Sequence, residues 1–454
     1  MGKEKKAQFD EPIYDAKVLG TPKMLVLGLQ HLFAMFGATV LVPILTGLSV
    51  SATLLFAGLA TLFMHLVTGK KVPVFLGSSF AFLGGYFGVV ASGAELGLSQ
   101  AEALPYACVG VACAGLLYLV LSLICKAFGS KNVMRFFPPV VTGPIIIAIG
   151  LILAPSAINN CSTNWWIALV AIVVVIVCNI WGKGMIKIVP ILMGVLASYL
   201  VAALTGNVDF SGVKEAAWIG LPVKMENTVF SLFGAENFNA GLLVSSIFMI
   251  VPIAFATMME HVGDISAIGG AIERNLIEDP GLHRTLIGDG IGTSIAALFG
   301  APANTTYGEN TGVLVLTKVY DPKVVRLAAV YAIVLSFCPK FAALISAMPA
   351  ATIGGVSIIL YGMISAVGVR NMVENHTDFQ KSRNVIVAAV ILGLALGINF
   401  SDLGAVAFTV GSTTISLTGL AVASIVGILL NAILPGKRDE YMPNQENSGS
   451  LGKF

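Results

Sequence analysis

Charged residues are scarce in this sequence. Asp, Glu, Lys and Arg make up 11% of its 454 residues, whereas soluble domains carry about 25%. Hydrophobic residues make up 56%, and the mean hydropathy is +0.89. A water-soluble fold of this length could not bury so much apolar surface, because part of every fold must face its solvent. We therefore predict that lipid surrounds most of the chain.

Several common functional signatures are also missing. No run of Lys and Arg is dense enough to indicate a nucleic-acid partner. The six cysteines form no CxxC pair and none lies near a histidine at the spacing of metal ligands, so no metal or other cofactor is expected. The sequence has no HExxH or GxSxG motif. Glu260 and His261 are adjacent and hence on different helix faces, so we do not expect an enzyme.

Long apolar runs dominate the sequence instead. A membrane-spanning helix needs about 20 apolar residues. Twelve runs approach that length, and two further stretches, 72–90 and 302–318, are long enough but contain Pro, Gly, Ser, Thr and Asn. The twelve runs are 24–45, 51–69, 105–125, 137–155, 164–181, 187–205, 240–263, 284–300, 325–347, 350–370, 384–399 and 415–434. With both interrupted stretches, the sequence predicts fourteen crossings.

The basic residues support this count. With the N-terminus inside, fourteen crossings place all but three of the 26 Lys and Arg residues in inside segments, as the positive-inside rule requires. The exceptions are Lys214, Lys224 and Lys340. Treating either interrupted stretch as a loop destroys this pattern. We therefore predict a multi-pass protein of the cell (inner) membrane with both termini cytoplasmic.

The interrupted stretches occupy the third position in each half of seven crossings. An odd number per half gives the halves opposite orientations. Each stretch begins with an extended run, and backbone broken by Pro and Gly must lie in protein or beside water, because lipid cannot satisfy it. We predict an all-α polytopic membrane protein with fourteen segments in a 7+7 inverted repeat, with segments 3 and 10 broken into an extended stretch and a half-helix. The half-helix N-termini should meet at mid-membrane and favour ligand carbonyls.

Few acidic residues lie within the predicted spans. Glu260 and Asp264 share a helix face, and Glu309 begins the second half-helix. A charge at membrane depth costs at least about 2.5 kcal/mol, so such residues mark ion or substrate paths by default. Structural alternatives remain for each of them. Glu260 could pair with His261 or His31, Glu309 could satisfy helix N–H groups, and Asp264 could be a solvated cap.

Two carboxylates beside free backbone donors suit a small planar ligand. Carboxylates accept hydrogen bonds from ring N–H groups, and backbone N–H groups donate to ring carbonyls, as uracil requires. Phe80 could add a ring contact. Burial favours the protonated form of a carboxylate, so Glu260 or Asp264 could carry a coupled proton without a metal. His31 and Tyr361 fit interior packing at least as well as a direct role.

Four segments carry a family resemblance. They are Gln30–Pro43, Leu76–Phe82, Asn304–Asn310 continuing to Gly312 and Thr317, and Pro349–Gly368 with its Gly354-Gly355-Val356 and Tyr361-Gly362. On these motifs the chain resembles the nucleobase–ascorbate transporter family over residues 24–434, and within it the bacterial uracil permeases. The resemblance implies import of uracil or a related nucleobase with protons, by alternating access, in a homodimer within the lipid bilayer.

The resemblance also implies a division into domains. A core domain would hold spans 1–4 and 8–11, and a gate domain spans 5–7 and 12–14. The corresponding boundaries are a cytoplasmic leader at 1–23, core parts at 24–130 and 240–347, gate parts at 131–206 and 348–436, an extracellular loop at 207–239, and a cytoplasmic tail at 437–454.

The implied substrate site lies between the two broken spans. Its principal ligands would be Glu260 and Glu309, and the proton would be handled by Glu260, Asp264 and His31. Further substrate contacts would come from Ala38, Phe80, Tyr307, Gly308 and, from the gate side, Tyr361. The chain departs from the uracil permease that it most resembles in having Asp264 where that protein has His.

Two other substrate classes stay open. Purine-transporting relatives carry Gln at the position of Glu309, yet a xanthine or urate permease of the same family remains an alternative. An anion transporter or channel on the same fold is a further alternative. Such a protein would favour a basic residue where Glu309 stands, so the acid argues against it.

Overall fold

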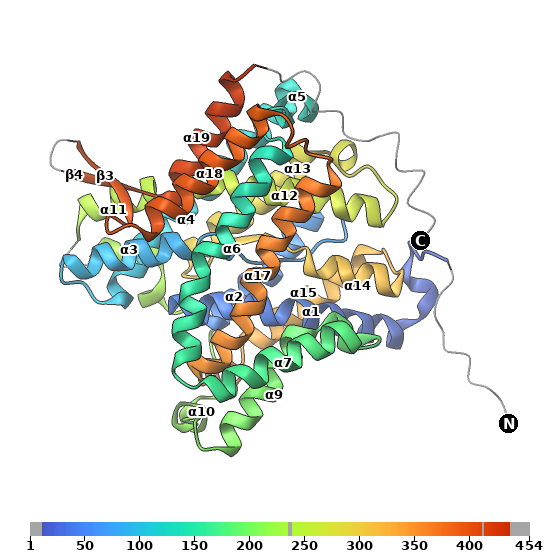
Figure 1. Cartoon of the computed structure of the whole chain (residues 1–454). Coiled ribbons are helices and arrows are strands. Elements are labelled where there is room, and N and C mark those ends of the chain that lie inside the picture. Colours follow the sequence, from blue (N-terminus) through green and yellow to red (C-terminus); the bar gives the residue numbers. More distant parts are fainter. Residues whose placement is uncertain (1–10, 235–237, 411–412, 436–454) are drawn as a thin grey trace.

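The computed structural model describes residues 11–234, 238–410 and 413–435, and these are mostly helical (Figure 1). The first half contains the helices α1 Thr21–Thr46, α2 Val50–Val67, α3 Leu83–Glu95, α4 Gln100–Phe128, α5 Ser130–Met134, α6 Pro139–Ser162, α7 Trp165–Trp181, α8 Met185–Ile188, α9 Pro190–Leu204 and α10 Ser211–Glu215. The second half contains α11 Ala240–Ile250, α12 Ile253–Ala271, α13 Leu282–Leu298, α14 Glu309–Thr317, α15 Pro322–Ser336, α16 Pro339–Ser346, α17 Ala350–Glu374, α18 Ser382–Phe400 and α19 Gly419–Ile433.

Seven described helical segments are long and apolar enough to cross a membrane. They are α1, α2, α4, α6, the α11–α12 stretch, α17 and α18. The helices α7, α9 and α19 are apolar but shorter. The prediction of a mostly helical chain with many membrane-length apolar helices is therefore confirmed at this level.

Two predicted runs are not straight helices. The run 325–347 is divided into α15 and α16, which are bent by 89° from one another, with Pro339 at the start of α16. The run 240–263 is divided between α11 and α12 at Val251 and Pro252. Proline lacks an amide hydrogen and clashes with the preceding turn, so it ends or kinks a helix but is tolerated in a first turn.

The all-α prediction missed a β-hairpin before the last helix. Strands β3, Ala405–Val410, and β4, Thr413–Thr418, pair antiparallel. The predicted run 415–434 is thus a strand up to Thr418, whose hydroxyl oxygen accepts a hydrogen bond from Ala421 N (3.3 Å) and caps α19. The β-branched residues around Thr413 favour a strand, and this local signal was available in the sequence.

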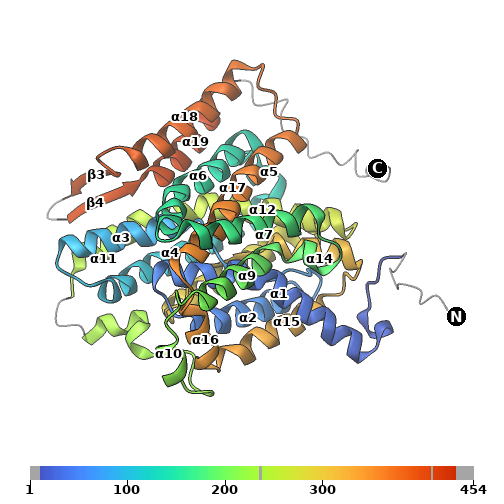
Figure 2. The ribbon, with the colours of Figure 1, turned by 60° about the horizontal axis from the view of Figure 1, so that its bottom comes forward.

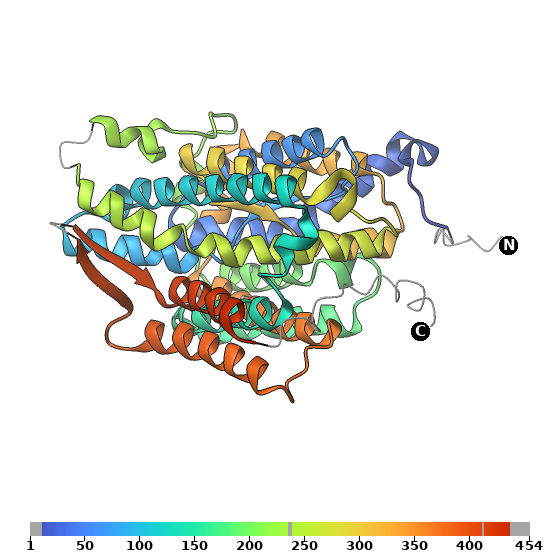
Figure 3. The same cartoon turned by 90° about the horizontal axis from the view of Figure 1, so that it is seen from above.

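The long helices pack in two groups. In the first, α2 packs against α13 and α15, and α4 packs against α11 and α13. In the second, α6 packs against α17 and α18, α7 packs against α9 and α17, and α18 packs against α19. Figure 3 shows the orange and red C-terminal helices on one side and the early blue helices on the other.

Glycines allow α6 and α17 to approach closely. A Cβ atom at Gly150 would lie 2.2 Å from the carbonyl oxygen of Tyr361, and one at Gly368 would lie 2.6 Å from that of Gly143. Small residues at helix contacts are typical of membrane bundles, where side-chain packing rather than the hydrophobic effect of water drives helix association.

The hairpin β3–β4 lies at the opposite end of the molecule from the start of α1 (Figures 1 and 2).

Candidate functional site

Two short strands from distant parts of the chain pair at the centre of the fold. Strand β1, Leu76–Ser78, is antiparallel to β2, Asn304–Thr306, with Gly77 opposite Thr305. Every residue of both strands is buried. The pairing continues beyond the strands, because Tyr307 N donates to Phe75 O (3.0 Å). Buried backbone groups are thereby satisfied where no continuous helix satisfies them.

Tyr307 lies against this strand crossing. Its hydroxyl donates to the carbonyl oxygen of Ser78 (2.9 Å), and its ring covers Gly77. A Cβ atom at Gly77 would lie 2.4 Å from the Tyr307 ring and 2.8 Å from the hydroxyl of Thr39. Only glycine therefore fits between these side chains. Tyr307, predicted to contact substrate, is here a buried residue that holds β1.

Gly77→Ala is expected to destabilise the protein. The added methyl group must displace the Tyr307 ring or move β1, and overpacking of this kind costs about 1–3 kcal/mol. Thermal unfolding in detergent measures the effect. Gly84→Ala is the matched control, because a Cβ atom at Gly84 meets no atom within 4 Å. An unfolding temperature unchanged in Gly77→Ala would contradict the tight contact.

A buried aspartate and a buried histidine, on α13 and α12, connect these helices to β2. His261 on α12 and Asp289 on α13 are separated by 2.8 Å between Nδ1 and Oδ2, and their side chains have no exposed surface. Thr306 donates to Asp289 twice, from its backbone N (3.2 Å) and from its hydroxyl (3.0 Å). The other ring nitrogen of His261 is 2.9 Å from the Thr285 hydroxyl. This network fixes β2 relative to α12 and α13.

Sequence reasoning missed Asp289. It is an acid within the apolar run predicted at 284–300, flanked by Gly288 and Gly290. An intramembrane acid is a functional or structural signal by itself, so its position could have been noted. Its partner was not readable, because His261 is 28 positions away.

Asp264 lies beside the start of the second half-helix. Gly308 immediately precedes α14, and a Cβ atom there would lie 3.2 Å from the Asp264 carboxylate. Asp264 is partly buried, one helical turn beyond Glu260, which is also partly buried. Both carboxylates are on α12, which contacts both β2 and α14. Asp264 lies within α12, which continues to Ala271.

The first residues of α14 also contact α1. The side-chain nitrogen Nδ2 of Asn310 lies 3.2 Å from His31 Nδ1 and donates to the backbone carbonyl oxygen of His31 (3.1 Å). His31 is fully buried. The predicted ligand Glu309 is the first residue of α14, but its side chain lies outside the described part of the structure.

The remaining predicted residues surround the β1 side of the crossing. The ring centroids of Phe80 and Tyr361 are 6.1 Å apart, with the planes tilted by 73°. Tyr361 comes from α17 in the second group, and Phe80 lies just before α3, which packs against α4 and α11 of the first group. This contact therefore joins the two helix groups. Ala38 is buried on α1, and its neighbour Thr39 accepts a hydrogen bond at its carbonyl oxygen from the Ser78 hydroxyl (2.7 Å).

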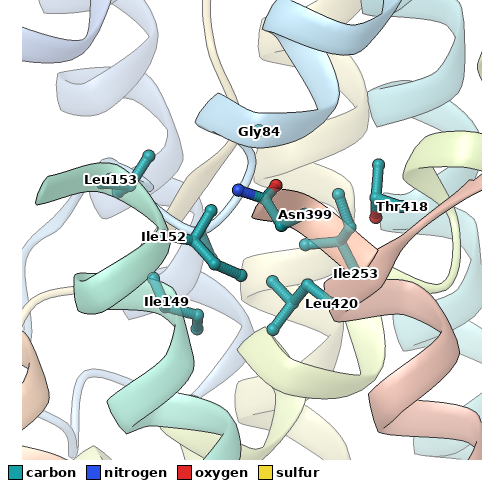
Figure 4. Close-up of a pocket in the computed structure, with 9 residues that line it drawn as sticks. Gly84, Ile149, Ile152, Leu153, Ile253, Asn399, Thr418 and Leu420 are labelled. Carbon is teal, nitrogen blue, oxygen red and sulfur yellow. The ribbon is translucent and has the colours of Figure 1, made fainter. Parts of the chain in front are cut away.

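A pocket opens beside Ala81, the residue after Phe80, and its lining includes residues of α3, α6, α12, α18 and α19 (Figure 4). Its lining is mostly aliphatic, with the polar side chains of Asn399 and Thr418. The lining residues are Ala81, Gly84, Ile149, Ile152, Leu153, Ile253, Asn399, Thr418 and Leu420. None of the predicted ligands lines it. The pocket is therefore distinct from the carboxylate cluster on α12.

Comparisons with known proteins agree with the resemblance. Residues 22–404 match the model of the Xan_ur_permease family, described as a permease family. The chain is 40% identical over 434 residues to the uracil permease of Bacillus caldolyticus, covering 94% of each chain. It is 37% identical over 431 residues to the uracil permease of Bacillus subtilis, covering 92% of this chain and 94% of the other.

A solved structure shows the same fold. The transmembrane domain of the cyanobacterial bicarbonate transporter BicA is similar with a TM-score of 0.61 at 16% identity, covering 93% of this chain and 99% of that one. The identity is too low to carry more than the fold. The family match and the apolar helices together identify the chain as a multi-pass membrane protein that belongs to the Xan_ur_permease family of permeases.

Proposed function

We propose that this protein imports uracil together with protons by alternating access. The observation that carries the proposal is the meeting of two interrupted segments beside acidic residues. The β1–β2 crossing brings the start of α14 next to Asp264, and Glu260 lies one turn away on the same helix. The curated relatives reported above are named uracil permeases.

The binding chemistry follows from these groups. Glu260 and Glu309 accept hydrogen bonds from the two ring N–H groups of uracil, and backbone N–H groups at the start of α14 donate to a ring carbonyl. Phe80 and Tyr361 supply aromatic contact from the two helix groups, and Ala38, Tyr307 and Gly308 complete the contacts. Glu260, Asp264 and His31 handle the proton. Asp264, which lies against Gly308, is placed to link protonation to the position of α14.

The transport cycle uses the two helix groups as moving parts. The group containing α2, α4, α13 and α15 forms the core domain of 24–130 and 240–347. The group containing α6, α7, α9, α17, α18 and α19 forms the gate domain of 131–206 and 348–436. With the fourteen segments as an inverted repeat and both termini cytoplasmic, the gate moves against the core and exposes the site to either side. Two copies form a homodimer in the inner membrane.

Uptake of radiolabelled uracil into proteoliposomes tests this function. We expect uptake to rise when the lumen is more alkaline than the outside, because inward proton movement then drives import. Competition with xanthine separates a uracil permease from a purine permease, and uracil uptake should persist in excess xanthine. Uptake that ignores the pH gradient contradicts proton coupling, and uptake abolished by xanthine favours the purine alternative.

An anion substrate is the second candidate, because solved structures with a similar fold are named a bicarbonate transporter and an anion transporter. The groups beside α14 argue against it. An anion would gain from helix N–H groups but would be repelled by the carboxylate of Asp264, which lies close to Gly308. Bicarbonate is therefore expected not to compete with uracil.

A further inference from the structure

The segment before α1 is docked on the loops that follow the two site helices. We call residues 11–19 the N-terminal strap. Ile13 pairs with the loop after α14, donating to Lys318 O (2.8 Å) and accepting from Tyr320 N (2.8 Å). Ala16 N donates to the Asp321 carboxylate (2.8 Å). Figures 1 and 2 show this blue start of the chain beside α14.

Tyr14 joins that loop to the loop after α12. Its hydroxyl donates to the carbonyl oxygen of Ile272 (3.0 Å), the residue after α12. The Arg274 guanidinium lies 4.7 Å from the centre of its ring, a cation–π distance. The ring centroid of Tyr14 is also 5.6 Å from that of Tyr320. One side chain therefore contacts both loops.

Polar and apolar contacts hold the strap in place. Lys323 donates to the Asp15 carboxylate (2.9 Å). This bond, together with the backbone N–H of Lys17, lowers the pKa of Asp15. Ala16 and Leu19 are buried against Val319 and Val324. The strap is thus anchored to α15 as well as to the loop before it.

The strap contacts the loops at the C-terminal ends of α12 and α14, the two helices that carry the proposed carboxylate ligands. α14 has 9 residues and is about 13 Å long, with Gly308 at one end and the strap-bound loop at the other. α12 carries Glu260 and Asp264 and ends at the loop that Tyr14 contacts. Because α14 is a short, continuous helix, we expect a shift at its strap end to move Gly308 as well.

We propose that Tyr14 is a positioning residue, through which the N-terminal strap fixes α12 and α14 relative to one another and thereby sets the affinity of the site. This inference rests on the proposed function for its ligand. It predicts that loosening the strap weakens substrate binding without any contact between strap and substrate. The coupling acts through the separation of the carboxylates on α12 from the start of α14.

Three variants of the full-length protein test the inference. Tyr14→Ala removes the ring and the hydroxyl, and we expect uracil to bind about fivefold more weakly, a typical coupling between distant sites. Tyr14→Phe keeps the ring contacts with Arg274 and Tyr320, and it should restore most of the affinity. Val18→Ala is the matched control on the strap, because the Val18 side chain is 75% exposed. Isothermal titration in detergent measures all three.

Hydrogen exchange of the ligand-free protein gives a readout that does not depend on uracil. In Tyr14→Ala, exchange should quicken in 309–321 and 260–274 but stay unchanged in α6. Wild-type affinity in Tyr14→Ala, or an equal loss in Val18→Ala, overturns the inference. If the wild-type protein binds no uracil, the proposed function fails. The exchange data then test the positioning role of Tyr14 separately, and unchanged exchange in both segments of Tyr14→Ala overturns that role.

Discussion

Glu260→Ala is expected to weaken uracil binding strongly while leaving the protein folded. In the proposed site this carboxylate accepts a hydrogen bond from one ring N–H group, and a hydrogen bond to a charged group contributes about 1.5–3 kcal/mol. Losing it weakens binding about tenfold to a hundredfold. Glu260 is only partly buried on α12, so its removal leaves no large cavity. Isothermal titration with uracil measures the loss.

Two further variants make this result specific. Glu309→Ala should lose binding to a similar extent, because it removes the second acceptor. Glu95→Ala is the matched control, since Glu95 is an exposed acid at the end of α3, and it should bind uracil like the wild-type protein. If both Glu260→Ala and Glu309→Ala retained uracil binding, the site would have to lie elsewhere.

Asp289→Ala is expected to cause the largest loss of stability. The variant leaves His261 and Thr306 without their shared buried partner. Breaking a buried pair by removing one member costs about 3–5 kcal/mol, a large part of a typical folding free energy of about 5–15 kcal/mol. The yield of folded protein and its unfolding temperature in detergent should both fall.

A second variant separates the effect of the lost hydrogen bonds on stability from the effect of the lost charge. Asp289→Asn keeps the shape and one acceptor oxygen, so it should be destabilised less than Asp289→Ala. Asp209→Ala removes an exposed acid whose hydrogen bond to Ser211 N is local (2.8 Å), and it should unfold like the wild-type protein. An Asp289→Ala protein as stable as the wild type would show that β2 is held by backbone pairing alone.

The interrupted stretches show what the local sequence pattern can predict and what it cannot. Pro73 and Gly77 in the first stretch and Pro302 and Gly308 in the second mark backbone that a lipid-facing helix cannot accommodate, so their special role was readable. That Gly77 lies opposite Thr305 was not readable, because nothing local relates positions 228 residues apart. The same holds for the contact between Tyr14 and Ile272, which are 258 positions apart.

Local features were also misjudged where length and hydropathy were the only guides. The bend at Pro339 and the strand β4 both lie within runs that hydropathy alone treats as continuous. Hydropathy reports the solvent around a segment, whereas Pro and β-branched residues decide its backbone conformation.

By itself, the sequence determined that lipid is the solvent, that the chain is mostly helical, which segments are interrupted, and which family it resembles, because composition, run length and local motifs depend on neighbouring residues alone. The tertiary structure decided which acid pairs with His261, what covers Gly77, and that the N-terminal strap lies against the loops after α12 and α14. Those partners are brought together only by the packing of helices from distant parts of the chain, and no local pattern records that packing.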